Sequence, residues 1–142
     1  MADEVHDVVQ GDGFAVAHID ALGEPHGFRK IRRELGVTAF GINAVVLPPG
    51  CASRLHYHDE QEETYFVHRG RVEFEFGDGI KHQLGPGGVA RVDAATLRRV
   101  RNLSEAEDAI FVCAGGKGGY VGRDGRMPDG EAPVQGPPGA AQ

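Results

Sequence analysis

Residues 50–70 read GCASRLHYHDEQEETYFVHRG, and this stretch carries the spacing that decides the fold. His56 and His58 are two residues apart, so on a β-strand their side chains point to the same face. Glu63 begins the next expected strand, where a chain reversal can turn its carboxylate back toward both imidazoles. Two histidines and one carboxylate on one face of a metal form the facial triad of non-haem iron sites, so the spacing indicates a metal site.

A second interpretation of the same stretch needs no metal. A His-x-His pair on an exposed strand is often only part of a polar surface. The acidic run at residues 59–63 is also typical of a solvated loop. The chemistry of the stretch alone leaves both interpretations open.

The chain around this stretch is patterned as short strands. Val72, Phe74 and Phe76 alternate with Glu73 and Glu75, which is the period of a half-buried strand. Further strands are expected at residues 14–19, 37–47, 63–68, 80–84, 89–92, 97–102 and 109–114, with glycine- and proline-rich turns between them. Short strands at this spacing predict an all-β sandwich or barrel, not a βαβ fold.

The length of 142 residues fits one domain, which we divide into three parts. Residues 1–36 are expected to form an N-terminal arm of strands, with a short helical turn within residues 27–35. Residues 37–114 form the barrel, and residues 115–142 form a C-terminal tail rich in glycine and proline. The chain has almost nothing to bury beyond about Gly122, so a mobile tail is expected over residues 127–142.

The stretch at residues 50–70 resembles the first motif of the cupin superfamily at every fixed position. The matching residues, in the spacing Gly-x5-His-x-His-x4-Glu-x6-Gly, are Gly50, His56, His58, Glu63 and Gly70. Residues 84–88 look like the Pro-Gly turn of the second cupin motif, and Arg98-x3-Asn102 looks like its closing His-x3-Asn. The resemblance covers about residues 37–113 and implies a small single-domain cupin. Its fold would be a double-stranded β-helix, or jelly-roll barrel, with a site inside.

The resemblance also implies a cofactor and an assembly. His56, His58 and Glu63 would hold a divalent transition metal, and the sequence does not choose among Fe, Mn, Ni and Zn. Small cupins of this kind usually form homodimers, so a homodimer is expected here.

Arg98 stands where the cupin pattern has a third metal-binding histidine. Arginine stays protonated and has no lone pair for a metal. Three outcomes follow: the remaining triad still binds a metal, Arg98 pairs with Glu63 in a metal-free site, or Arg98 binds the carboxylate or phosphate of a ligand. Tyr65 shares a strand face with Glu63 and is the second expected ligand-binding residue, with a role in the cavity wall as its alternative.

The charge and composition of the chain limit the classes of partner and the location that we expect. The formal net charge of -6 argues against non-specific binding of nucleic acid. No apolar run approaches the length needed to span a membrane. The two cysteines, Cys51 and Cys113, do not form the pattern of a secreted disulfide framework, so the expected location is the cytoplasm.

Together these observations predict a metal-dependent enzyme of the dioxygenase or isomerase kind that acts on a small molecule inside the barrel. One alternative is a non-catalytic module that binds a small anionic ligand, with or without a metal. Another is a scaffold that acts only by dimerising. The fold class does not select among these functions, and the sequence assigns no catalytic residue.

Overall fold

Strand β6 (Glu62–Arg69) shows how alternating side chains become a barrel wall. Glu63, Tyr65 and Val67 are buried, whereas the residues between them are exposed. Strand β10 (Arg98–Asn102) buries every second residue in the same way, and these are Arg98, Val100 and Asn102. Both inward sets are the ones predicted from strand periodicity, and they include every site residue expected on these two strands.

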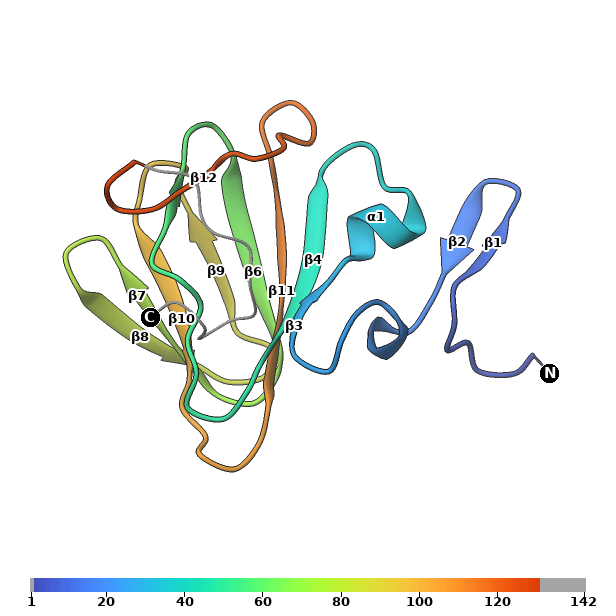
Figure 1. The fold of residues 1–142 in the computed structure, drawn as a ribbon, viewed down its shortest axis with the longest axis horizontal. Coiled ribbons are helices and arrows are strands. Elements are labelled where there is room, and N and C mark those ends of the chain that lie inside the picture. The colour runs from blue at the N-terminus through green and yellow to red at the C-terminus, as the bar shows by residue number, and fades with distance from the viewer. Residues whose placement is uncertain (1, 131–142) are drawn as a thin grey trace.

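The computed structural model describes residues 2–130, whose strands form two facing sheets (Figure 1). One sheet has the antiparallel order β3-β4-β11-β6-β9, and the other has the order β10-β7-β8. The remaining strands of these sheets are β3 (Gly27–Arg29), β4 (Gly41–Leu47), β7 (Val72–Phe76), β8 (Ile80–Leu84), β9 (Val89–Val92) and β11 (Ala109–Gly116). A short pair, β5 (Tyr57–His58) and β12 (Gly125–Arg126), lies across one end of the barrel. The all-β double-stranded β-helix predicted from the sequence is therefore confirmed.

The N-terminal arm differs in detail from the prediction. The expected strand at residues 14–19 is shorter, because β2 (Phe14–Val16) pairs only with β1 (Val9–Gly11) and a 3₁₀-helix, η1 (Ile19–Ala21), follows. The helical turn expected within residues 27–35 is confined to α1 (Ile31–Leu35), because residues 27–29 pair with β4 as strand β3. Figure 1 shows the β1–β2 hairpin standing away from the barrel. No helix among residues 2–130 is long and apolar enough to cross a membrane.

Two glycines of the first motif have conformations that explain their presence. Gly50 and Gly70 have φ values of 71° and 82°, in the left-handed region that side chains disfavour. A Cβ at Gly70 would also lie 3.0 Å from the Cβ of Ala109. The motif glycines therefore turn the chain at both ends of the segment that carries the histidines.

The C-terminal segment differs from the prediction made from the sequence. Residues beyond Gly122 were expected to bury almost nothing, but Asp124 is buried and strand β12 pairs with β5. The reason is a long-range contact, since the segment packs against the loop that follows His58. Strand β11 also runs to Gly116, two residues past the expected end of the barrel. The division at residues 36 and 114 stays a prediction, and residues 131–142 of the expected tail lie outside the described residues.

The core lies between the two sheets and is closed at one end by a buried amide. Phe74, which is fully buried, stacks on Phe76 and meets the ring of Tyr65 edge-on. At the end of β10, Asn102 Nδ2 donates to the carbonyl oxygens of Leu47, Pro48 and Glu107. Its Oδ1 accepts from the backbone N–H of Ser104. This one side chain thus joins the chain after β4 to the loop between β10 and β11.

We predict that Asn102→Ala lowers the free energy of unfolding by about 2–3 kcal/mol, because buried carbonyl groups lose their donor. Urea-induced unfolding measures the change. Gln83→Ala is the matched control, because Gln83 is exposed on β8 and its truncation should cost less than about 0.5 kcal/mol. Equal losses in the two variants would contradict a structural role for the Asn102 amide.

Candidate metal centre

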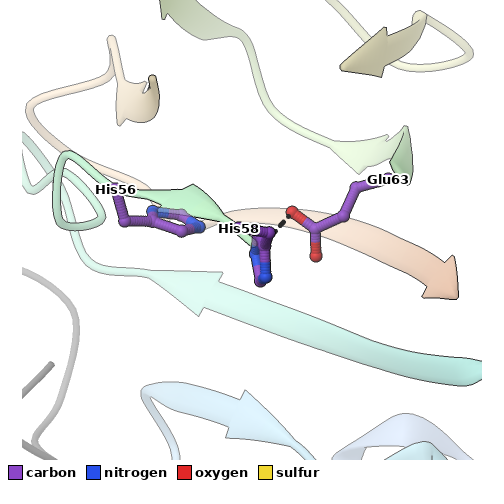
Figure 2. Close-up of side chains that lie close together, drawn as sticks. All are labelled: His56, His58 and Glu63. Carbon is purple, nitrogen blue, oxygen red and sulfur yellow. Dashed lines mark ion pairs between the residues drawn. The ribbon is translucent and has the colours of Figure 1, made fainter. Parts of the chain in front are cut away.

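Three side chains converge at the end of the barrel where β5 crosses it. His58 lies on β5, His56 lies just before β5, and Glu63 lies on β6 (Figure 2). One nitrogen of each imidazole and one carboxylate oxygen all lie within 4.8 Å of one another. The backbone of His56 is fixed by reciprocal hydrogen bonds with Arg98, at 3.1 and 2.8 Å. The structure thus brings together the three residues that the sequence spacing predicted, in a group small enough to hold one cation.

The hydrogen bond of His56 sets its tautomer. Its Nδ1 lies 2.8 Å from the carbonyl oxygen of Arg54, and a carbonyl only accepts, so Nδ1 carries the hydrogen. The lone pair is therefore on Nε2. Burial lowers the pKa of His56 from 6.5, outweighing the raising effects of the Arg54 carbonyl and Glu63. A neutral imidazole with a free Nε2 is the form that binds metals.

His58 has two nitrogens in different surroundings. Its Nδ1 lies 3.1 Å from the side-chain amide nitrogen of Gln61 and 3.6 Å from Oδ2 of Asp124. Its Nε2 lies 3.1 Å from Oε1 of Glu63 (Figure 2), but the geometry of this contact is not that of a hydrogen bond. Within residues 2–130, His58 Nε2 therefore has no hydrogen-bond partner, and the buried side-chain oxygen of Gln61 has none either. Turning the Gln61 amide over lets its Oε1 accept from Nδ1–H, which leaves the Nε2 lone pair for a cation. The two unpartnered atoms therefore fit a metal-binding tautomer of His58.

The Glu63 carboxylate is buried and held on both oxygens. The Tyr65 hydroxyl donates to Oε1 at 2.8 Å, and the Cys113 thiol donates to Oε2 at 3.1 Å. Burial alone would raise its pKa, but His58 and the positive charge of Arg98 outweigh burial and lower the pKa to about 2. The group is therefore an anion at neutral pH. The lone pairs that Oε2 does not share with Cys113 remain for a cation.

Arg98 and Tyr65, the expected ligand-binding residues, both face Glu63. Arg98 is fully buried, and its guanidinium donates to Glu63 Oε1 at 3.2 Å. The same group donates to the carbonyl oxygens of Ala94 and Thr96. Neither Arg98 nor Tyr65 lines the cavity beside the cluster. Their binding of a ligand stays a prediction. Arg98 pairs with Oε1 of Glu63, and this ion pair does not by itself decide whether the triad also binds a metal.

Asp124 and Cys113 belong to the site although sequence reasoning did not place them there. Asp124 comes from the C-terminal segment, and its carboxylate accepts from the backbone N–H groups of Glu60 and Gln61 at 2.9 and 2.8 Å. It thereby fixes the loop between the two ligand-bearing strands. Burial raises the pKa of Cys113, so its thiol keeps the proton that it donates to Glu63. No local signal pointed to Asp124, a single acidic residue in a glycine-rich run.

The cluster forms part of the wall of a cavity of about 640 Å³. Strands β4 and β11 supply one side of it, and the C-terminal segment from Tyr120 to Gly125 supplies another. Helix α1 and strand β3 also reach it through Arg32 and Phe28. This volume is that of a small-molecule site, and the cluster is the buried end of it.

Comparison with known families gives one match. The family model described as the cupin domain matches residues 43–115, which is more than half of the chain. Asn43 lies on β4 and Gly115 on β11, so the matched segment contains the whole cluster but neither α1 nor Asp124. No curated protein matches the chain.

Solved structures are similar to this chain at low sequence identity. An uncharacterized conserved protein with a double-stranded beta-helix domain from Klebsiella pneumoniae is 20% identical with a TM-score of 0.61, over 72% of this chain and 90% of that one. A sugar phosphate isomerase from a cupin superfamily, from Silicibacter pomeroyi, is 25% identical with a TM-score of 0.58, over 76% and 79%. A structure of DMSP lyases is 25% identical with a TM-score of 0.52, over 62% of this chain and 43% of that one.

We predict that Asp124→Asn weakens the binding of Zn²⁺ about 10-fold or more, because loss of an outer carboxylate that orients a ligating histidine typically costs this much. Competition with a fluorescent chelator measures the affinity. Asp78→Asn, in the exposed turn between β7 and β8, removes the same charge without touching the cluster. Equal affinities in the two variants would show that Asp124 does not position His58.

We predict that His56 makes the metal-free protein less stable in mild acid. Below pH 6.5 the unfolded chain takes up a proton at this residue, whereas the folded protein with its lowered pKa does not, so stability falls as the pH falls. His56→Gln should therefore lose less stability than the parent between about pH 7.5 and pH 5.5, measured by urea unfolding. His82→Gln, on the exposed strand β8, should lose as much as the parent. An unchanged pH dependence in His56→Gln would rule out a neutral His56.

Proposed function

The chain belongs to the cupin family, and from that premise we propose that it is a metal-dependent enzyme acting on a small molecule inside its barrel. The single observation that carries the proposal is the group of His56, His58 and Glu63, whose ligand atoms lie within 4.8 Å of one another beside a cavity of about 640 Å³. A scaffold that acts only by dimerising needs neither feature.

His56, His58 and Glu63 would hold a divalent transition metal, and Fe, Mn, Ni and Zn are all compatible with two imidazoles and a carboxylate. Such a metal would supply Lewis-acid polarisation of an oxygen-containing group of the substrate. His56 and His58 offer Nε2 lone pairs, and Glu63 offers a negative charge. With three protein ligands, such a metal would keep coordination positions for the substrate, because Arg98 cannot serve as a further ligand.

The chemistry of the solved neighbours supports a small-molecule substrate. One solved structure at 25% identity is that of a sugar phosphate isomerase, and another at the same identity is described as a structure of DMSP lyases. Both names describe reactions on small molecules, which a cavity of this size also accommodates. An isomerase-like or dioxygenase-like reaction is accordingly our proposal for the class.

A second candidate is a metal-free module that binds a small anion. The observation in its favour is the ion pair of Arg98 with Glu63, at 3.2 Å, which already neutralises the carboxylate. In this function the imidazoles of His56 and His58 would bind the ligand directly. Metal content therefore separates the two candidates.

We also propose that the protein forms a homodimer in the cytoplasm. The β1–β2 hairpin stands away from the barrel and exposes Val9, Phe14 and Val16. The cross-strand pair Phe66 and Val89 is exposed on the outer face of the larger sheet. Apolar side chains gathered in this way are typical of contact surfaces between protein chains.

We predict that protein purified without a histidine tag or added metal contains about one transition-metal ion per chain. His56→Ala with His58→Ala should lose it, because two of three ligands are gone. His68→Ala with His82→Ala is the matched control, since both residues are exposed and outside the cluster. Elemental analysis by mass spectrometry gives the content. A metal-free parent that also fails to bind added Zn²⁺ or Ni²⁺ would refute the enzyme proposal and leave the anion-binding module.

A further inference from the structure

We propose that the mouth of the cavity binds the oxyanion of the substrate, a phosphate ester or a carboxylate, through Arg32 and Arg123. The inference rests on the proposed function, because it assigns the substrate class of the same site. Both arginines line the cavity whose buried end holds His58 and Glu63. Neither belongs to residues 43–115, the segment that matches the cupin family.

Arg32 is held in place by an aromatic ring and keeps its donors. It lies on α1, and the carbon of its guanidinium group is 3.9 Å from the centroid of the Tyr120 ring. Stacking uses the face of the guanidinium and leaves its N–H groups, which lie in the plane, for a ligand. Across residues 2–130 these N–H groups make no hydrogen bond or ion pair, whereas the neighbouring Arg33 pairs with Glu34 at 2.9 Å. Arg32 is therefore an oriented cation without a carboxylate.

Arg123 lies on a second element that lines the cavity, the C-terminal segment. Its φ is 54°, which makes it the one non-glycine residue among those described with a left-handed backbone. Such a conformation is costly for a side chain and persists where neighbouring contacts impose it. The next residue, Asp124, is fixed by the hydrogen bonds of its carboxylate with the backbone of Glu60 and Gln61. The guanidinium of Arg123 also has no partner within the described part of the chain.

The charges of the cavity leave the mouth positive. Its acidic residues are Glu63 and Asp124, and both are buried and engaged, Glu63 with Arg98 and Asp124 with backbone N–H groups. No other carboxylate of residues 2–130 lines the cavity to offset Arg32 and Arg123. This local excess of positive charge occurs in a chain whose formal net charge is -6. An anion is the ligand that such a mouth selects.

The positions of these side chains along the cavity determine how a bound ligand would be oriented. His58 and Glu63 are buried, Arg32 is half-buried and Arg123 is exposed, so the arginines lie toward solvent. A bound molecule would place its oxyanion between the arginines and a neutral oxygen-bearing group at the cluster. Arginine is suited to the first role because its forked N–H groups match two oxygens of a phosphate or carboxylate.

The test uses the full chain, in metal-free and Zn²⁺-loaded form, and two probes, inorganic phosphate and malonate. Calorimetric titration at constant ionic strength, balanced with sodium chloride, measures their affinity and removes unspecific screening. Arg32→Met and Arg123→Met each delete one guanidinium but keep an apolar stem. Arg33→Met is the matched control, because it removes the same charge from the same helix at a residue already paired with Glu34. Melting temperature in sodium chloride alone shows whether each variant is folded.

We expect millimolar or tighter binding of at least one probe by the parent and by Arg33→Met. Binding should be about 10-fold weaker in Arg32→Met and in Arg123→Met, the usual effect of losing a charge-assisted hydrogen bond. Tighter binding of phosphate than malonate would assign a phosphate ester, and the reverse order a carboxylate. Zn²⁺ content should be unchanged in every arginine variant.

Two results would overturn the inference: no binding of either probe by a folded parent, or equal affinities in Arg32→Met, Arg123→Met and Arg33→Met. A parent that binds no Zn²⁺ but still binds the anions through Arg32 would refute the enzyme proposal alone. The failure of one proposal is therefore distinguishable from the failure of the other. If Arg32→Met does not fold, Arg32→Lys replaces it, with a weakening expected from loss of the forked donors.

Discussion

The negative charge of a buried carboxylate must be balanced by nearby donors or positive charges, and the contacts that balance Glu63 bring the two sheets and the candidate site together. The oxygens of Glu63 receive Arg98 from the opposite sheet, Cys113 from β11 and Tyr65 from its own strand, with His58 3.1 Å away. An unpaired charge at this depth would cost several kcal/mol, so these contacts together stabilise the fold as well as the site. The two sheets, the crossing strand β5 and the candidate metal site thus meet at one anion.

This arrangement also explains how the site tolerates an arginine where the family has a histidine. Arg98 donates to Oε1 and to two backbone carbonyl groups, so its charge is satisfied on the side of Glu63 away from the cavity. The Oε2 side remains for a cation. The cluster therefore lacks a further histidine, but the carboxylate of Glu63 is still held on both oxygens.

The sequence predicted the features that follow from the alternation of residues along a strand. It did not predict the features that depend on contacts between distant parts of the chain. Alternation along β6 and β10 predicted the inward faces, and the spacing of His56, His58 and Glu63 predicted their convergence. Nothing local marks Asp124, because its partners lie more than sixty residues earlier in the chain. Arg32 likewise matches an ordinary solvated helix face until Tyr120 is seen stacked on it. A single sequence carries no signal for such pairings.

The strand pairing of β12 with β5 has a consequence for the order of events during synthesis. A nascent chain that has emerged as far as β11 already contains the two sheets and the triad. It still lacks the residues that anchor the loop after His58 and pair with its strand, which arrive only with residues 124–126. Since chains grow from the N-terminus at about 5–20 residues per second, the strands of both sheets leave the ribosome before the segment that completes the pocket. The site therefore depends on residues that leave the ribosome after the last barrel strand, and a chain that ended at β11 would keep the three ligand residues but lack the strand and the carboxylate that hold the loop beside them.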